Sequence, residues 1–303
     1  VRFEECEWSR FPTVVRWSYS PTANDGRICL SFTSKETYFT LANRWRAVAN
    51  ALWRMISSYP EISFWEIPVD VSDCFDPSVP ASTFRFAKLP SDPHNLIPNA
   101  YFLDWRHRLP PAIPWERKQD TVYFRGSLTG TVQSRENARA AACLVARTIP
   151  DADCKLTMFH QTPVELRAEL EQEGITCRRD RVNALNNHRY LLDIDGNSSS
   201  WHRFWLIGMF RSVPIRFETQ WQECWHELIR EGQHFVAATR HDFGEVVKNL
   251  RANPRTSQAI ADAAAEVAHG LLSPQGAQQM FEEAWLRRVE SAADSRRPIQ
   301  VRW

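Results

Sequence analysis

The first third of the chain has one long stretch of helical periodicity. Between residues 36 and 56, apolar side chains recur every three or four positions, which predicts a helix with a buried face that includes Trp45, Val48 and Leu52. A strand is expected over residues 59–70, ending at Asp70. From there to Pro114 prolines are frequent and periodicity is weak, which predicts loops with short strands.

From about residue 112 the pattern alternates between short apolar runs and helical spacing. The apolar runs predict strands at residues 120–126, 154–159, 188–194, 213–217 and 233–238. Helices are expected between them, at residues 134–149, 163–173, 201–211 and 221–231. Ser134 is the expected N-cap of the first of these helices. Strands that alternate with helices are typical of a parallel sheet covered by helices on both faces.

The change of pattern predicts an α/β protein with two lobes. We expect an N-terminal lobe over residues 1–111 and a second lobe over residues 112–274. Residues 275–303 are expected to form a C-terminal helix that packs back toward the N-terminal lobe. The apolar stripe of that helix contains Met280, Phe281, Ala284 and Trp285.

Composition narrows the possible functions. The net charge of +1 gives no sign of a general nucleic-acid-binding protein. The seven cysteines are scattered and form no CxxC pair, so the sequence supports neither a zinc site nor a dithiol motif. Reduced thiols of this kind suit a cytosolic setting. No apolar run approaches the roughly 20 residues of a membrane span.

Two loops carry groups that suit a phosphate. The stretches "YFRGSLTG" and "DIDGNSSSWHR" each follow an expected strand, and each combines glycine, hydroxyl groups and an arginine, Arg125 or Arg203. Ligands of open parallel sheets bind beyond the carboxyl ends of the strands, and arginine holds phosphate oxygens with two N–H groups. Ordinary turn chemistry is the alternative, because neither loop matches a Walker P-loop or GxGxxG.

Acidic residues offer two further hypotheses. Asp193 and Asp195 form a DxD pair, and alternation along a strand would place both carboxylates on one face, where they could hold a divalent metal. Asp70 closes its expected strand and is a candidate general base, with Asp73 and Asp76 as nearby alternatives.

Two signatures in the second lobe resemble those of glycosyltransferase family 90. "IPWERKQDTVYFRGSLTG" resembles one, and the stretch that begins "HRYLLDIDGNSSSWHRFWLIGMFRSVPIRF" resembles the other. The resemblance runs from about Glu61 to Ala268 and is most specific over Trp115–Arg135 and His188–Val236. The family includes Rumi-like protein O-glucosyltransferases, capsule-associated xylosyltransferases and lipopolysaccharide glycosyltransferases.

This resemblance implies a GT-B-like architecture of two Rossmann-like lobes, with the donor held mainly by the C-terminal lobe. It implies an inverting reaction that needs no metal. The donor-binding residues that it implies are Arg125, Gly126, Ser127, Arg135, Gly196, Ser199, Ser200 and Arg203. One extra residue between Gly196 and the arginine leaves His202 as an alternative to Arg203.

In the N-terminal lobe, the resemblance places the catalytic aspartate at Asp70. The flanking residues depart from the family pattern, because Val69 stands in place of arginine and Val71 in place of tryptophan. The stretch "FRFAKL" matches a family motif that would bring Phe86 and Lys88 near the donor, with Ala87 in place of serine.

The expected function is transfer of a sugar, glucose or xylose, from a UDP-sugar to a hydroxyl of a glycan, lipopolysaccharide or protein. No cofactor, metal or nucleic-acid partner is expected. A non-catalytic nucleotide- or carbohydrate-binding protein is the alternative. The ending "PIQVRW" lacks a KDEL-type signal, which favours the bacterial cytoplasm, with or without attachment to a membrane surface, over a secretory lumen.

Overall fold

A computed structural model gives the structure of the chain. It describes residues 13–19, 28–32, 41–59, 65–73, 76, 78–104, 108–159 and 162–294. Residues 1–106, 222–225 and 273–303 form unit 1, and residues 107–221 and 226–272 form unit 2. We describe each unit by itself.

Unit 1 contains a mixed five-stranded sheet in the order β2-β1-β3-β4-β5. The strands are β1 (Val14–Tyr19), β2 (Ile28–Phe32), β3 (Trp65–Asp70), β4 (Phe84–Arg85) and β5 (Asn95–Leu96). β1 runs antiparallel to both β2 and β3, whereas β3, β4 and β5 are parallel. Asp70 therefore lies at the carboxyl end of β3, beside Arg85 on β4.

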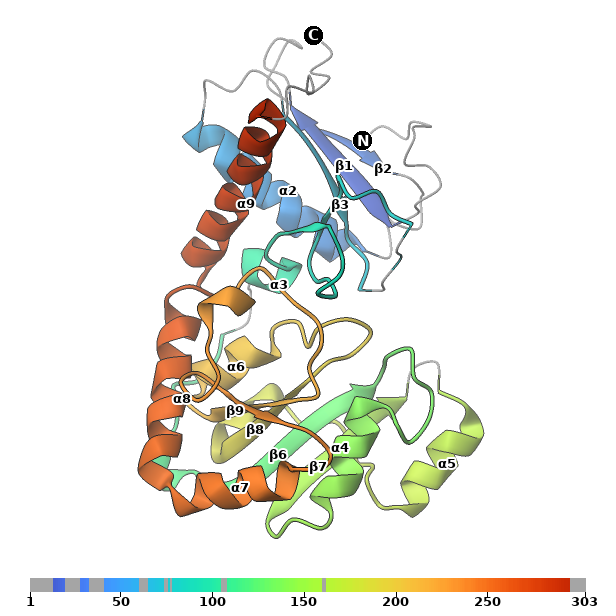
Figure 1. The fold of residues 1–303 in the computed structure, drawn as a ribbon, viewed down its shortest axis with the longest axis vertical. Helices are drawn as coiled ribbons and strands as arrows, with labels where there is room; N and C mark the ends of the chain where they lie inside the picture. The colour runs from blue at the N-terminus through green and yellow to red at the C-terminus, as the bar shows by residue number, and fades with distance from the viewer. Residues whose placement is uncertain are drawn as a thin grey trace. The chain divides into compact units, whose positions relative to one another are not determined.

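Three helices complete unit 1: α2 (Ala42–Ser58), α3 (Ala100–Leu103) and α9 (Pro274–Asp294). The apolar stripe expected from the sequence is the buried face of α2, since Trp45, Val48 and Leu52 are buried. Arg54 of α2 donates to the carbonyl oxygen of Leu103 at 3.1 Å and to Gln278 at 3.0 Å, which joins α2 to α3 and α9 (Figure 1).

Unit 2 contains a five-stranded sheet in which every recorded strand pair is parallel, in the order β10-β9-β8-β6-β7. The strands are β6 (Gln119–Leu128), β7 (Ala152–Phe159), β8 (His188–Ile194), β9 (Val213–Phe217) and β10 (Val236–Ala238). β6 and β8 lie in the middle of the sheet, and their central residues are buried.

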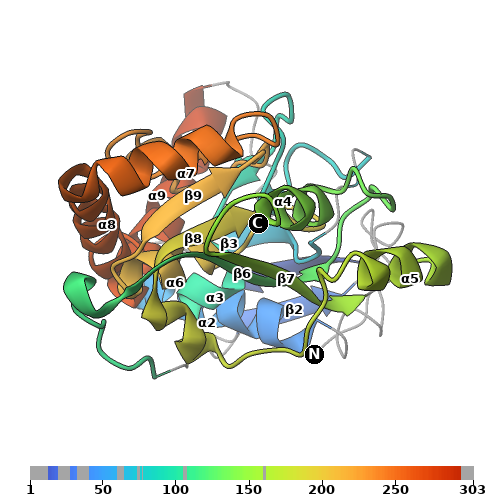
Figure 2. The same cartoon turned by 90° about the horizontal axis from the view of Figure 1, so that it is seen from below.

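Helices cover both faces of this sheet. α4 (Ala138–Ala146) and α7 (Phe243–Ala252) lie on one side, and α6 (Arg203–Met209) lies on the other (Figure 2). α8 (Pro254–His269) packs against α6, while α5 (Val164–Gln172) follows β7. Short 3₁₀ helices span Trp115–Arg117, Val182–Asn187 and His226–Leu228. An apolar cluster lies between the sheet and α4, α7 and α8.

The α/β class and the two sheet-containing units are confirmed. The hairpin β1–β2 had no expectation from the sequence. The expected helix at residues 221–231 is wrong, because only His226–Leu228 turns helically and Gln222 instead bridges Lys88. Ser134 is not the N-cap of α4, since Asn137 accepts from the backbone of Arg139 there. In the described part of the chain no helix has the length and hydropathy that a membrane crossing requires.

Candidate active site

In unit 2, the two stretches that carry the expected phosphate-binding groups lead to one edge of the sheet, although Arg125, Gly126 and Ser127 belong to β6 itself and not to a loop. β6 and β8 are parallel neighbours, so both of their carboxyl ends point to that edge. We call residues 129–137, between β6 and α4, the β6 loop, and residues 195–202, between β8 and α6, the β8 loop. The backbone N–H of Gly130 donates to Asn197 Oδ1 at 2.8 Å, which joins the two loops. This edge is where open parallel sheets bind ligands.

Arg203 begins α6 and extends its side chain to β6. Its Nη2 donates to the carbonyl oxygen of Arg125 at 2.8 Å, and its guanidinium lies 5.1 Å from the centre of the Phe124 ring. Among the described residues no carboxylate lies within ion-pair distance of it. Burial lowers the pKa of Arg203, against the opposing charge of Asp193. Arg203 is therefore a desolvated cation whose charge no ion pair within the described residues neutralises.

Arg139, near the start of α4, is a second buried cation at this edge. Its guanidinium donates to the carbonyl oxygens of Ser127, Ile194 and Asp195 and to Thr129 Oγ1, at 2.8 to 3.2 Å. Burial, and then the charge of Arg203, lowers the pKa of Arg139 to about 10. Both arginines remain charged at neutral pH, so the edge concentrates positive charge.

The side chain of Arg125 is held by acidic residues. Its Nη atoms pair with both carboxylate oxygens of Asp153 at 3.0 and 2.6 Å, and its Nε donates to Asp180 at 2.9 Å. The guanidinium also lies 4.4 Å from the centre of the Tyr123 ring. Its contact with Arg203 is through its backbone carbonyl group, so Arg125 as a donor-binding side chain stays a prediction.

Neighbouring side chains of the chain itself explain why positions 126 and 196 hold glycine, a residue without a Cβ. A Cβ on Gly126 would lie 2.5 Å from the ring of Phe124, and one on Gly196 would lie 2.8 Å from Arg139 Nη2. Ser199 is buried and its hydroxyl accepts from the backbone of Trp201 at 3.2 Å. The carbonyl oxygen of Ser200 accepts from the backbone of Arg203. These small residues shape the β8 loop, which turns at Trp201 with a φ of 60°.

Three further expected residues lie at or near the loops. Ser127 contributes its carbonyl oxygen to Arg139. Arg135 instead pairs with Glu169 and Glu173 near the end of α5, at 2.5 and 3.0 Å, and is 42% exposed. His202 directly precedes α6. The structure thus brings Ser127, Gly196 and Arg203 together, whereas the guanidinium of Arg135 is held by α5.

Asp193 and Asp195 have separate environments. Asp193 is fully buried and lies 3.3 Å from Arg216 on β9. Asp195 Oδ2 accepts from the backbone of Gln220 and Trp221 at 2.9 and 3.2 Å, and burial raises the pKa of Asp195 to about 7. No group of three or more potential metal ligands occurs among the described residues.

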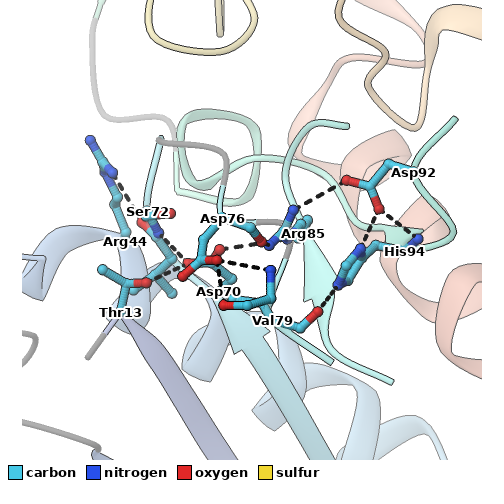
Figure 3. Close-up of polar contacts among 11 residues, drawn as sticks. Thr13, Arg44, Asp70, Ser72, Asp76, Val79, Arg85, Asp92 and His94 are labelled. Atoms are coloured by element: carbon cyan, nitrogen blue, oxygen red, sulfur yellow. Dashed lines mark hydrogen bonds and ion pairs between the residues drawn. The ribbon is translucent and has the colours of Figure 1, made fainter. Parts of the chain in front are cut away.

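In unit 1, Asp70 belongs to a buried network of charges that we call the Asp70 network: Asp70, Arg85, Asp92 and His94 (Figure 3). Asp70 Oδ1 accepts from Thr13 Oγ1 at 2.8 Å and from the backbone of Ser72 at 3.0 Å. Asp70 Oδ2 lies 3.6 Å from Arg85 Nε, and Asp70 is 2% exposed.

Arg85 links Asp70 to Asp92, to which its Nη1 donates at 3.1 Å. Asp92 also contacts Nδ1 of His94, whose Nε2 lies 2.8 Å from the carbonyl oxygen of Val79. Burial raises the pKa of Asp92, but hydrogen bonds from His94 and the charges of His94 and Arg85 outweigh it, so the net pKa lies below the usual value. The guanidinium of Arg85 thus lies between the carboxylates of Asp70 and Asp92.

The remaining expected residues of unit 1 lie on either side of the network. Asp73 is half-buried and 3.6 Å from Arg44, whereas Asp76 is exposed, and hydrogen bonds from Ser78 lower its pKa. Phe86 is buried, and Lys88 pairs through its backbone with Gln222. Phe86, Lys88 and Asp70 all belong to unit 1.

Arg139, Arg85 and the Asp92–His94 pair were not among the residues expected from the sequence. Arg139 had a usable signal, because it stands among small residues that include Ala140, Ala141 and Ala142, all buried in α4. An arginine beside such a face has to find hydrogen-bond acceptors locally. Arg85 had no comparable signal, since its role depends on the register of β3 and β4.

Comparisons with known structures give weak likenesses. Anabaena Alr3699/HepE in complex with UDP-glucose matches 56% of this chain and 48% of its own, at 11% identity and a TM-score of 0.39. S. aureus TarM was crystallised as a G117R mutant with Fondaparinux, alpha-GlcNAc-glycerol and UDP. The match covers 59% of this chain and 37% of TarM, at 9% identity and a TM-score of 0.41. The match to the C-terminal domain of LpcC from Francisella tularensis covers 53% of this chain and 94% of that domain, at 13% identity and a TM-score of 0.38.

The chain spans about half or less of the length of the first two of these proteins. A search among curated proteins finds no match. The sequence profile of Glycosyl transferase family 90 matches residues 107–278, which include all of unit 2 and both of its loops. The match extends over more than half of the chain. The chain belongs to glycosyltransferase family 90.

Proposed function

We propose that this glycosyltransferase moves a sugar from a UDP-sugar to a hydroxyl of a glycan, lipopolysaccharide or protein, with inversion at the anomeric carbon and without a metal. Glucose and xylose are the proposed sugars. Arg203 carries the proposal, because it is a desolvated cation with no carboxylate in ion-pair distance among the described residues. A diphosphate at this edge would offset the desolvation of its charge.

The proposed chemistry assigns roles by charge. The acceptor oxygen attacks the anomeric carbon and forms the new C–O bond, while the bond to the diphosphate breaks and UDP leaves with the electron pair. Asp70 takes the acceptor proton, a role that typically contributes about 10²–10⁴-fold in rate. Arg203 stabilises the negative charge that develops on UDP. A fixed cation of this kind needs no reorganisation during the reaction.

The donor site that we propose retains the residues implied by the family. Arg125, Gly126, Ser127, Arg135, Gly196, Ser199, Ser200 and Arg203 are its proposed members in unit 2, with Phe86 and Lys88 in unit 1. Arg125 contributes to this site through its backbone carbonyl group, which accepts from Arg203, because its guanidinium pairs with Asp153 and Asp180. The guanidinium of Arg135 pairs with Glu169 and Glu173, so its contacts support the proposal less than those of Arg203 and of the β8 loop.

The burial of Asp70 favours a second candidate function, nucleotide-sugar binding without transfer. A general base has to contact the acceptor hydroxyl, and Asp70 is 2% exposed. A binding protein would use the cationic edge of unit 2 and leave Asp70 as a structural acid.

Donor screening with and without acceptors separates the two candidates. UDP-glucose and UDP-xylose are incubated with glycan, lipopolysaccharide and peptide acceptors, with and without EDTA, and released UDP is measured. Acceptor-dependent release with an inverted anomeric centre in the product supports the transferase. Binding of UDP with no release under any of these conditions supports the binding protein. Loss of release on adding EDTA, restored by a divalent metal, would contradict metal independence.

A further inference from the structure

The backbone pairing between β6 and β8 stops before the two strands end. The paired residues run from Gln119 and His188 to Tyr123 and Leu191. β6 continues to Leu128 and β8 to Ile194. Beyond the last pair, backbone hydrogen bonds no longer fix the distance between the two strands, although both strand ends lead into the proposed donor-binding loops.

The guanidinium of Arg139 links the two strands beyond that point. On the β6 side, Nη1 donates to the carbonyl oxygen of Ser127 and to Thr129 Oγ1, both at 2.8 Å. On the β8 side, Nε donates to the carbonyl oxygen of Asp195 at 2.9 Å and Nη2 to that of Ile194 at 3.2 Å. A planar guanidinium holds several acceptors at fixed angles, which a lysine ammonium on a flexible stem does not.

Neighbouring residues fix Arg139 in this role. Gly196 leaves the space that the guanidinium fills, since a Cβ there would lie 2.8 Å from Nη2 and 2.9 Å from Thr129 Oγ1. Asn137 holds the other side, because its Nδ2 donates to the carbonyl oxygens of Thr129 and Val132 while its Oδ1 accepts from the backbone of Arg139. Thr129 is thus held by both Arg139 and Asn137.

We propose that Arg139 is a positioning residue of the nucleotide-sugar site, which ties the carboxyl ends of β6 and β8 together so that the β8 loop and Arg203 keep the spacing that a diphosphate needs. This inference rests on the proposed function. Arg203 bonds to β6 through the carbonyl group of Arg125 and is anchored through α6 to the β8 loop. Any change in the separation of β6 and β8 therefore moves Arg203 relative to the β8 loop.

Arg251 provides a matched control. Its guanidinium donates to the carbonyl oxygens of Asp120, Pro150 and Asp151, at 2.8 to 3.3 Å, near the amino ends of β6 and β7. Arg139 and Arg251 therefore both join segments of one sheet through backbone carbonyls, but at opposite ends of β6. A purely structural effect should appear with either arginine.

The test compares Arg139→Met, Arg139→Lys, Gly196→Ala and Arg251→Met in the full chain. Calorimetric titration gives the affinity for UDP and for uridine, which lacks the diphosphate. Misplacement of Arg203 relative to the β8 loop should weaken UDP binding by about 10- to 100-fold in Arg139→Met. The affinity for uridine should stay within about threefold of the wild-type value. Arg139→Lys and Gly196→Ala should change UDP affinity in the same direction, and Arg251→Met should change neither affinity.

An equal loss of affinity for UDP and for uridine in Arg139→Met would overturn the inference. The same loss of UDP affinity in Arg251→Met would also overturn it. Unchanged UDP affinity in Arg139→Met would also overturn it. If Arg139→Met does not fold, Arg139→Lys and Gly196→Ala are judged by the same comparison.

Hydrogen exchange separates failure of this inference from failure of the proposed function. If the wild-type chain binds no UDP, the proposed donor is wrong, but the link between the strands remains testable. Amide exchange of Gly130 and Gly196, which bond to Asn197 and Ser198, should then accelerate in the Arg139 variants and not in Arg251→Met. Equal exchange in all of these proteins would overturn the positioning role.

Discussion

Arg203 Nη2 lies 2.8 Å from the carbonyl oxygen of Arg125, so Arg203 at the start of α6 contacts Arg125 of β6 through a backbone group. The guanidinium of Arg125 bonds instead to Asp153 and Asp180. A diphosphate could therefore bind the guanidinium of Arg203 without breaking an ion pair of the described residues, whereas binding to the guanidinium of Arg125 would have to break its ion pairs. The two arginines should therefore respond differently to substitution.

Arg203→Met should impair the donor site. Loss of one preorganised charge typically removes about 2–4 kcal/mol of transition-state stabilisation, so kcat/KM should fall by about 30- to 1,000-fold. UDP affinity, measured by calorimetry, should fall as well. Arg211→Met is the control, because Arg211 follows α6 and pairs with Asp262, where both side chains are more than a third exposed. A wild-type kcat/KM in Arg203→Met would remove Arg203 from the mechanism.

Arg125→Met should lower stability more than donor binding. It removes hydrogen bonds to Asp153, Asp180 and the carbonyl oxygen of Phe124, which should lower the free energy of unfolding by about 1–3 kcal/mol. UDP affinity should stay within about threefold, because the carbonyl group that bonds Arg203 remains. Urea unfolding and calorimetry measure the two effects. A loss of UDP affinity as large as that of Arg203→Met would show that the Arg125 side chain binds the donor.

Two glycines on helices of unit 2 should respond to alanine with opposite signs. A Cβ on Gly208 of α6 would lie 2.7 Å from the carbonyl oxygen of Ala264 and from the Cβ of Ala268, so Gly208→Ala has to separate α6 from α8. Overpacking of this kind destabilises by about 1–3 kcal/mol. Gly244 of α7 has no atom within 4 Å of its Cβ position, so Gly244→Ala should stabilise by about 0.5–1 kcal/mol. An unchanged or raised stability in Gly208→Ala, measured by urea unfolding, would contradict the packing of α6 on α8.

The sequence predicts the elements of unit 2 well because their apolar periodicity is strong. The strands expected at residues 120–126, 188–194 and 213–217 correspond to β6, β8 and β9. The helix expected at residues 221–231 does not form, for a physical reason. Trp221 and Trp225 are both buried at helical spacing, but Gln222 between them pairs with Lys88, so the backbone there is not helical. Periodicity of apolar residues shows which side chains are buried, and tertiary pairing decides the backbone.

The candidate site was only partly predictable, because hydrogen-bond partners depend on tertiary contacts. Gly196 was expected among the donor-binding residues, and in the structure its neighbour is the guanidinium of Arg139. Arg135 and Arg139 are four residues apart, but one pairs with the acids of α5 and the other with the strand ends. The alanines that follow Arg139 indicate that it lies beside a buried face, but they do not identify the strand ends as its partners.

Asp70→Asn tests the assignment of the general base. If Asp70 takes the acceptor proton, transfer should fall by about 10²–10⁴-fold while UDP binding in unit 2 is unchanged. Substitution also weakens the attraction to Arg85, so some loss of stability is expected, and activity is measured well below the unfolding transition. Asp73→Asn is the control, because Asp73 is half-buried and pairs with Arg44 outside the Asp70 network.

Either of two results would contradict the assignment of Asp70 as the general base. Normal transfer in Asp70→Asn would make Asp70 a structural acid of the network. Loss of transfer in Asp73→Asn, with Asp70→Asn active, would move the base to the neighbouring acid. Both readings use the same assay of UDP release, so a single series of variants decides between them.

Asp195 should make the stability of the protein depend on pH. Burial raises its pKa to about 7, from an ordinary value of about 4, so between these two pH values the folded chain keeps a proton that the unfolded chain has lost. Between about pH 4 and pH 7 the folded state therefore binds more protons than the unfolded state, and the Asp195 contribution to stability falls as pH rises. Asp195→Asn retains an oxygen that can accept from Gln220 and Trp221 but carries no titrating proton.

The difference in unfolding free energy between wild type and Asp195→Asn isolates this group, because the other titrating groups are common to both proteins. Relative to the variant, the wild type should lose about 2–4 kcal/mol as pH rises from about 4.5 to 7.5. Urea titrations across that range measure the difference. A difference that stays constant with pH would mean that Asp195 is ionised throughout, and its carboxylate would then be stabilised in the folded state by the two backbone N–H groups.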